Sequence, residues 1–367
     1  MKLLVVNESK GCNIGDKAIH KGMEFLFEKV VDEIDQLQLS FELSNNNFSH
    51  KGYGFFSFLK RFRFFYKAYL LVRVFVYNFK RFGVVKDKIK SSDYVIFGGG
   101  SLLINNFTFP LNLFFISSLC HLYNKNYAVA GVSTRAIKNR FIRMLIKKFI
   151  KGADFVYVRD HHSKVLCKEQ FLVNADYAPD FALCLEKEDT VFLDRYRILI
   201  NVMGLQSHGF FSTQENVDNY ILFLKGLVAS LLGDSVNYSF SFFTTGEESD
   251  RLLINKLREN LNKEFGMVFD VFIPNSLSEL LEFYKTGDIV IATRLHSAII
   301  GLATGHRVVC FNWDSKVEGF FDSLSMGNSL VNLFSNLSEC IIKSERLNEC
   351  QNCFFEDLKM DVIRYGK

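Results

Sequence analysis

Short apolar runs alternate with amphipathic segments along almost the whole chain, and this alternation predicts an α/β fold. Runs of about four to eight apolar residues bounded by polar ones are typical of strands buried in a parallel sheet. The predicted strands lie at 2–6, 93–97, 127–132, 155–158, 197–203, 238–243, 267–272, 289–292 and 308–311. Helical periodicity separates them, most clearly at 16–29, 215–232, 249–264 and 276–285. Strands joined by helices in this order predict parallel sheets.

The pattern restarts halfway along the chain, which indicates two domains. A chain of 367 residues is longer than one hydrophobic core usually supports. Residues 176–194 contain Pro179 and several acids and are interpreted as the linker. We predict an N-terminal Rossmann-like domain over 1–185 and a C-terminal one over 195–335, facing a cleft. We expect the last segment, 336–367, to cross back to the first domain.

Polar side chains cluster after the strand predicted at 289–292. Arg294 and His296 lie between this strand and a helical pattern that starts at Ala298, so they occupy a strand-to-helix turn. The apolar run 308–311 leads into a second polar segment, which contains Lys316. Open α/β sheets bind ligands at the carboxyl ends of their strands, so we expect both segments at a ligand site.

Three polar segments follow predicted strands in the first half of the chain. They are Asn13-Ile14-Gly15-Asp16, Gly98-Gly99-Gly100-Ser101 and Val158-Arg159-Asp160. Asp16 fits a helix N-cap and an acceptor site equally well. The three glycines allow the backbone to approach an anion at a helix N-terminus, or simply allow tight packing of a helix on a strand. Arg159 is placed to reach into a cleft or to pair with a neighbouring acid.

Taken in order, these motifs resemble those of the polysaccharide pyruvyl transferase family. The similarity rests on Asn13–Ile19, Gly98–Ser101, Val158–Asp160, Arg294–Ala298, Ala303, Asp314, Lys316, Gly319 and Phe320. Family members resemble GT-B glycosyltransferases in fold. They transfer pyruvate from phosphoenolpyruvate to a sugar diol as a ketal. The resemblance therefore implies a GT-B-like enzyme that acts on a cell-surface polysaccharide or its lipid-linked precursor, with phosphoenolpyruvate as co-substrate and no cofactor.

Phosphoenolpyruvate carries a phosphate and a carboxylate, so its site needs two separate anion-binding groups. Arg294 offers a rigid bidentate fork and Lys316 a mobile point charge. Ketal formation also needs a proton on the methylene carbon, and His296 is the natural carrier near neutral pH. An isolated histidine more often has a structural role, in which its ring forms hydrogen bonds with neighbouring backbone groups. The motif around His296 favours a catalytic role.

The predicted site has three sets of residues. The catalytic set is His296, Arg294 and Asp16. The donor-binding set is Arg294, Lys316, Arg159, Ser297, Gly99, Gly100 and Ser101. The acceptor-binding set is Asn13, Asp16 and His208, the last of which follows the strand at 197–203.

The eight cysteines are scattered, most of them in apolar runs, which favours a reducing compartment. Cys350 and Cys353 form a CxxC pair, but no second pair accompanies them, so we predict no metal site. The amino terminus lacks the pattern of a signal peptide, and no apolar stretch reaches about 18 residues. We expect a cytoplasmic protein, and a peripheral position on the inner face of the cell membrane stays open.

Residues 57–90 form a basic, aromatic stretch. They contain ten Lys or Arg and one acid, Asp87, a net charge of 10 − 1 = +9, whereas the whole chain has +4. One predicted helical face holds Phe58, Phe62, Phe65 and Tyr69, and the other holds Lys60, Arg63 and Lys67. Such a helix either packs on its own domain or meets anionic lipid. No recognised nucleic-acid-binding fold accompanies it, so we expect no nucleic acid partner.

Two other functions fit the same pattern. A GT-B glycosyltransferase would use a nucleotide sugar and an acid that grips the ribose, for which Glu318 is the candidate. A non-enzymatic membrane-associated scaffold would use residues 57–90, but the presence of Arg294, His296 and Lys316 argues against a decayed site.

Overall fold

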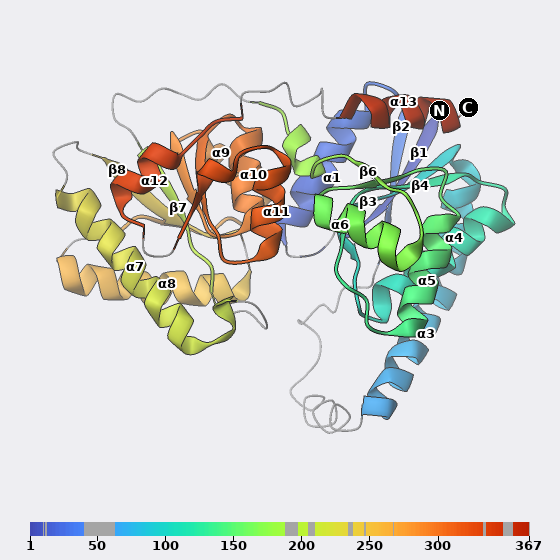
Figure 1. The fold of residues 1–367 in the computed structure, drawn as a ribbon, viewed down its shortest axis with the longest axis horizontal. Coiled ribbons are helices and arrows are strands. Elements are labelled where there is room, and N and C mark those ends of the chain that lie inside the picture. Colours follow the sequence, from blue (N-terminus) through green and yellow to red (C-terminus); the bar gives the residue numbers. More distant parts are fainter. Residues whose placement is uncertain are drawn as a thin grey trace. The chain divides into compact units, whose positions relative to one another are not determined.

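The computed structural model describes residues 1–9, 11, 13–39, 63–187, 197–204, 210–233, 238–245, 247–266, 268–332, 335–347 and 355–366. Contacts divide the chain into two compact units (Figure 1). Unit 1 comprises Met1–Gly11, Leu26–Asp180 and Phe355–Lys367, and unit 2 comprises Cys12–Phe25 and Phe181–Phe354. This division differs from the expected boundaries, because residues 12–25 cluster with the second unit.

Unit 1 is built on a six-stranded parallel sheet in the order β2-β1-β3-β4-β5-β6. Its strands are β1 (Lys2–Asn7), β2 (Glu33–Gln38), β3 (Tyr94–Leu103), β4 (Tyr127–Thr134), β5 (Val156–Val158) and β6 (Asp176–Tyr177). Its helices include α3 (Arg63–Ser91), α4 (Thr108–Leu122), α5 (Arg140–Lys151), α6 (His161–Leu166) and α13 (Glu356–Tyr365). The central strands β3 and β4 are almost entirely buried, as their continuous apolar runs predict.

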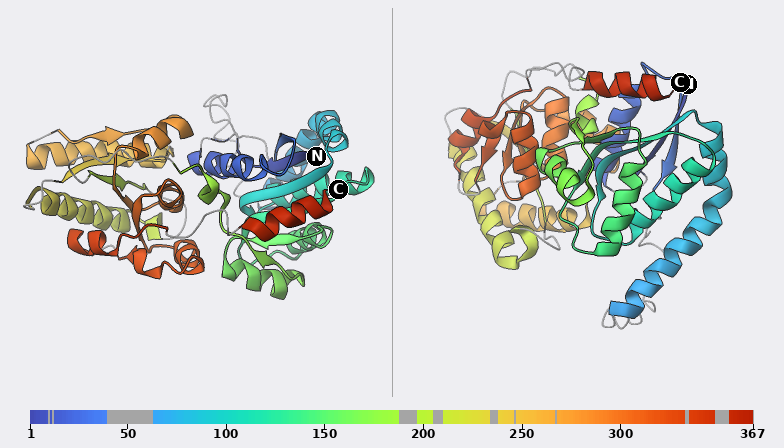
Figure 2. Two further views of the ribbon diagram at one scale, coloured as in Figure 1. Left: turned by 90° about the horizontal axis from the view of Figure 1, so that it is seen from above. Right: turned by 45° about the vertical axis from the view of Figure 1, so that its right-hand side comes forward.

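Helices α3, α4 and α5 share one core with the sheet of unit 1, to which they contribute Val85, Ile116 and Ile146 among others. The N-terminal end of α3 extends past α4 and α5 (Figure 2). Helix α13 returns to this unit from the end of the chain, where Tyr157 donates a 2.9 Å hydrogen bond to Asp361. Among the described helices, none combines the length and the apolarity needed to cross a bilayer.

Unit 2 repeats the architecture with the strand order β12-β11-β10-β7-β8-β9. Its strands are β7 (Arg197–Asn201), β8 (Ser239–Phe243), β9 (Val271–Phe272), β10 (Ile289–Ala292), β11 (Arg307–Phe311) and β12 (Leu330–Val331). Its helices are α1 (Ile14–Phe27, up to Phe25), α7 (Gln214–Gly233), α8 (Glu248–Phe265), α9 (Leu277–Tyr284), α10 (Leu295–Ala303), α11 (Ser315–Ser323) and α12 (Leu337–Lys343). All five pairings between these strands are parallel.

The glycine segment of β3 departs from the prediction. We expected the strand to stop at Phe97 and the glycines to lead into a helix, but β3 continues to Leu103 and α4 begins only at Thr108. Gly99 and Gly100 both adopt φ of 79°, which residues with a Cβ rarely reach, and the pairing with β4 shifts register after Gly100. The glycines therefore form an irregularity inside a buried strand, and no helix N-terminus follows them directly.

Candidate functional site

The predicted strand-to-helix turn at Arg294 is confirmed in unit 2. Strand β10 ends at Ala292, and Arg294 is the N-cap residue of α10 with extended backbone angles. Asn201, at the end of the neighbouring strand β7, accepts hydrogen bonds from the backbone N–H groups of Thr293 (3.3 Å) and Arg294 (2.8 Å). A buried amide side chain thus fixes the backbone from which Arg294 and His296 extend.

The guanidinium of Arg294 is held by Asp250 from the first turn of α8. Its Nε lies 2.5 Å from Oδ2 of Asp250, and its Nη2 lies 2.8 Å from Oδ1. Asp250 is fully buried and also accepts a 2.8 Å hydrogen bond from the N–H of Gly204. Burial lowers the pKa of Arg294, but the Asp250 carboxylate more than offsets this, so the pKa of Arg294 lies above its ordinary value. The arginine is therefore a fixed, fully charged fork.

His296 packs against the start of α1. A Cβ placed on Gly15 would lie 2.4 Å from Nδ1 of His296 and 2.5 Å from Cγ, so no larger residue fits there without moving the ring. Asn13 shapes this approach, because its Oδ1 accepts a 2.9 Å hydrogen bond from the N–H of Gly15. Asp16 follows in the first turn of α1 and is half-buried. The structure thus brings the motif at 13–16 to the motif at 294–297 within one unit.

Lys316 lies in the first turn of α11, which begins directly after the short loop that follows β11. The cap of this helix is Asp314, whose Oδ1 accepts a 2.8 Å hydrogen bond from the N–H of Lys316. Trp313 connects this loop to the neighbouring turn, since its Nε1 donates a 2.6 Å hydrogen bond to the carbonyl of Thr293. Because β10 and β11 are adjacent and parallel, both loops emerge at the same edge of the sheet, as predicted.

Ser297, predicted to bind the donor, is fully buried at the start of α10. Tyr284 occupies its polar groups, with the Tyr284 hydroxyl 2.9 Å from Oγ and 2.8 Å from the Ser297 carbonyl oxygen. Burial raises the pKa of Tyr284, so the hydroxyl stays protonated and keeps this contact. The side chain of Ser297 therefore anchors α10 to α9.

The remaining predicted donor residues, Arg159, Gly99, Gly100 and Ser101, lie in unit 1, where Ser101 contacts Arg159. Arg159 is 6% exposed and forms an ion pair with fully buried Asp180. The second terminal nitrogen, Nη2, donates 3.2 Å hydrogen bonds to the hydroxyls of Ser101 and Ser133. Of the two alternatives for Arg159, the structure displays the ion pair with a neighbouring acid. Gly99 and Gly100 are buried in the same unit.

Two contributors to the site gave no recognisable signal in the sequence. Asp250 is one of several acids near a helix start, where acids are common. Asn201 ends an apolar strand as an ordinary polar residue.

His208, predicted to bind the acceptor, lies outside the described residues, as do Cys350 and Cys353. Within the ranges that are described, no group of three or more His, Cys, Asp or Glu side chains could hold a metal ion.

Residues 13–315 match the family model described as polysaccharide pyruvyl transferase. No curated protein sequence matches the chain significantly.

Among solved structures, UDP-GlcNAc 2-epimerase from Neisseria meningitidis bound to UDP-GlcNAc is 13% identical, with 99% of this chain and 100% of that chain covered and a TM-score of 0.52. The Methanocaldococcus jannaschii UDP-GlcNAc 2-epimerase in complex with UDP-GlcNAc and UDP is 12% identical over 100% of both chains, with a TM-score of 0.52. HepE from Anabaena in complex with UDP is 9% identical, with 100% and 92% coverage and a TM-score of 0.51. At such low identity the likeness concerns the fold alone, and it confirms the expected GT-B-like pair of Rossmann-like domains.

Proposed function

Because the chain belongs to the polysaccharide pyruvyl transferase family, we propose that it transfers pyruvate from phosphoenolpyruvate to a sugar diol as a ketal. The acceptor is a cell-surface polysaccharide or its lipid-linked precursor. Phosphoenolpyruvate is a co-substrate, and no further cofactor takes part. The observation that carries the proposal is the contact in unit 2 between the segment at Gly15 and the ring of His296.

The reaction moves two protons from the acceptor. Protonation of the methylene carbon turns it into a methyl group and leaves C2 electrophilic, and the first sugar hydroxyl attacks C2 and loses its proton. The bond between C2 and the phosphate oxygen then breaks, and the second hydroxyl closes the ketal. Of the two hydroxyl protons, one balances the proton taken up by the methyl group and the other leaves with hydrogen phosphate.

His296 is the residue suited to deliver the first proton, because imidazole exchanges protons near neutral pH. Its ring is packed against Gly15, which limits the orientations it can take. Restricted orientation matters because a general acid must lie within hydrogen-bonding reach of the atom it protonates.

Arg294 and Lys316 are suited to bind the two anionic groups of the donor. Asp250 fixes the Arg294 fork, so little conformational entropy is lost when an anion binds. Lys316 adds a charge from the adjacent loop, and the N-terminus of α10 favours negative charge nearby. Together these groups would stabilise the phosphate as it leaves.

The proposal is tested by following phosphate release from phosphoenolpyruvate with a panel of diol-bearing glycosides and lipid-linked sugars. Phosphate release should depend on the acceptor, and mass spectrometry should detect the pyruvylated product. His296→Ala should slow turnover by ~10²- to 10⁴-fold, the usual effect of losing a general acid, while calorimetry shows that the donor still binds.

The matched control is His162→Ala, which removes an exposed histidine of α6 and should leave turnover unchanged. Near-normal turnover in His296→Ala would make His296 structural. A protein that ignores phosphoenolpyruvate and consumes a nucleotide sugar would be a glycosyltransferase instead.

A further inference from the structure

Helix α3 carries large apolar side chains that the described part of the chain leaves uncovered. Phe75 is 70% exposed, Phe79 is 75% exposed and Val72 is 60% exposed. The rings of Phe75 and Phe79 stack on one another with centroids 6.4 Å apart. A contiguous apolar patch of this kind is uncommon on a monomeric protein and usually marks an interaction site.

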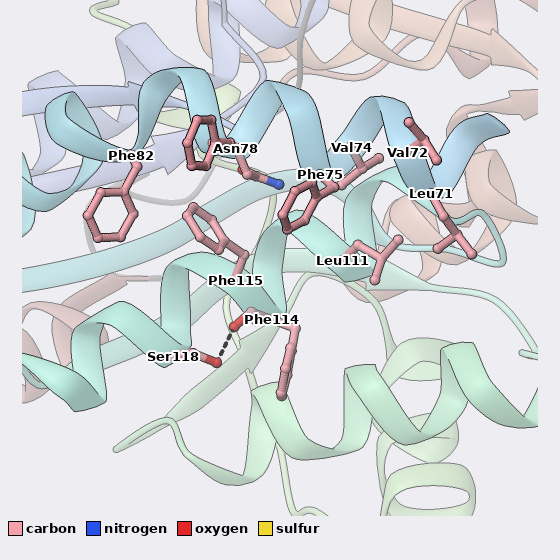
Figure 3. A pocket seen from close by; sticks show the side chains of 11 residues that line it. Leu71, Val72, Val74, Phe75, Asn78, Phe82, Leu111, Phe114, Phe115 and Ser118 are labelled. Carbon is pink, nitrogen blue, oxygen red and sulfur yellow. Dashed lines mark hydrogen bonds between the residues drawn. The ribbon is translucent and has the colours of Figure 1, made fainter. Parts of the chain in front are cut away.

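The patch continues into a groove between α3 and α4. The groove has a volume of about 680 Å³ and is lined by Phe75, Phe79 and Phe82 from α3 and by Leu111, Phe114 and Phe115 from α4. Side chains from both helices, such as Phe75 and Phe115, enter the space between them (Figure 3). Its lining is almost entirely carbon, which suits hydrocarbon and disfavours a polar ligand.

Lysines extend the same face of α3 toward its C-terminus. Phe75, Phe79, Phe82, Lys86 and Lys90 follow one another at intervals of three or four residues, which places them on one side of the helix. Lys90 is exposed, with its Nζ 4.7 Å from the centre of the Tyr123 ring, and Lys80 is exposed about 100° around the helix from Phe79. The helix as a whole has eight Lys or Arg and one acid, a net charge of 8 − 1 = +7.

Two of the basic residues of α3 support the fold instead. Lys88 forms a 2.5 Å ion pair with Asp35, and Arg81 donates hydrogen bonds to the carbonyl oxygens of Gln38 and Leu39. The face predicted from sequence around residues 58–67 lies outside the side chains that the structure describes. The exposed patch therefore begins further along the chain, at Leu71.

Exposed phenylalanines followed by lysines on one helix face are typical of helices that lie in a membrane interface. Phenylalanine enters the acyl boundary, and lysine meets anionic headgroups. A second copy of the chain fits less well, because an interface through this face would bring two helices of net charge +7 together. Charge complementarity thus favours an anionic partner with an apolar interior.

We propose that α3 and α4 form a docking surface for an anionic lipid bilayer. Phe75 and Phe79 insert among the acyl chains, and Lys80 and Lys90 contact the headgroups. The groove between the helices receives hydrocarbon from the same leaflet. This surface is separate from the residues proposed for pyruvyl transfer, so it stands or fails independently of that function.

The test is co-sedimentation of the full-length protein with vesicles of phosphatidylcholine alone or of equal parts phosphatidylcholine and phosphatidylglycerol. The protein should bind only the vesicles that contain phosphatidylglycerol, and added salt should weaken the binding. Phe75→Ser with Phe79→Ser should lower the partition coefficient at least about tenfold. Lys80→Gln with Lys90→Gln should lower it by roughly fivefold per lysine at low salt.

Matched controls come from unit 2, where Leu222 and Leu252 are 68% and 66% exposed. Leu222→Ser with Leu252→Ser, and Lys256→Gln with Lys263→Gln, should bind vesicles like the parent. Circular dichroism on heating should show equal folding of all variants, since every altered side chain is exposed. The proposal is overturned if the parent ignores anionic vesicles or if the phenylalanine variant binds them equally well. It is also overturned if ultracentrifugation detects a dimer that the phenylalanine variant dissociates, which would assign the face to a second copy.

Discussion

Two strand ends in this protein carry an arginine beside an aspartate, yet they differ in what surrounds the pair. At the end of β5 in unit 1, Arg159 is sealed against Asp180 and two serine hydroxyls. At the end of β10 in unit 2, Asp250 holds one edge of Arg294, whose side chain remains 16% exposed, and half-buried His296 lies two residues further on. An arginine at the end of a parallel strand thus forms a closed ion pair in one unit and remains a partly accessible cation beside a histidine in the other.

The largest effect is expected from removing the arginine of the buried ion pair between Arg159 and Asp180. Arg159→Met leaves the fully buried Asp180 without its cation, which should lower the free energy of unfolding by about 3–5 kcal/mol. Denaturant unfolding measures this loss. Arg140→Met, at an exposed position of α5, should change it by less than about 0.5 kcal/mol. If Arg159→Met instead keeps its stability and loses affinity for phosphoenolpyruvate, Arg159 binds the donor as the sequence predicted.

A smaller effect, on catalysis and not on folding, is expected at the open site. Gly15→Ala places a methyl group 2.4 Å from Nδ1 of His296, so the ring must move. A displacement of about 1 Å in a catalytic group can cost ~10²-fold in rate, which pyruvyl-transfer assays would detect. Gly226→Ala is the control, because its Cβ meets nothing within 4 Å. Gly226→Ala should leave its helix at least as stable as before. Equal turnover of the two variants would remove His296 from the mechanism.

The smallest effect is expected when the partly accessible Arg294 is replaced by a residue of the same charge but a different shape. A lysine at position 294 still pairs with Asp250 but offers a single point charge in place of the fork. Arg294→Lys should weaken donor binding about tenfold, close to the loss of one charge-assisted hydrogen bond. Calorimetry with phosphoenolpyruvate measures this change, and an unchanged dissociation constant would contradict the donor-site assignment.

Much of the fold was predictable because buried parallel strands produce continuous apolar runs. The pattern located β10, β11 and the turn between β10 and α10 within one or two residues. It missed β2, because Glu33–Gln38 is a polar edge strand in which Leu37 is the one buried residue. It also ended β3 too early, since consecutive glycines usually indicate a loop, whereas here positive φ angles allow the strand to continue.

The candidate site was predictable only in part. The turn and the adjacent loop position Arg294, His296 and Lys316 through local sequence, and local sequence was enough to find them. The contacts of Asp250 and Gly15 arise from tertiary packing between distant segments. An amphipathic pattern predicts which face of α1 is buried, but not the unit in which it is buried.

The docking of α1 also sets the order in which the protein can be completed during synthesis. Residues 12–25 leave the ribosome early, but α1 packs on the backbone of Phe181 and on His296, which lies 296 − 15 = 281 residues after Gly15. Contacts of such long range form slowly and leave apolar surface exposed in the meantime. Unit 1 likewise includes α13 from late in the sequence, where Asp361 accepts a hydrogen bond from the hydroxyl of Tyr157. Each unit therefore needs segments from both halves of this sequence, so neither is complete when only the first half has been synthesised.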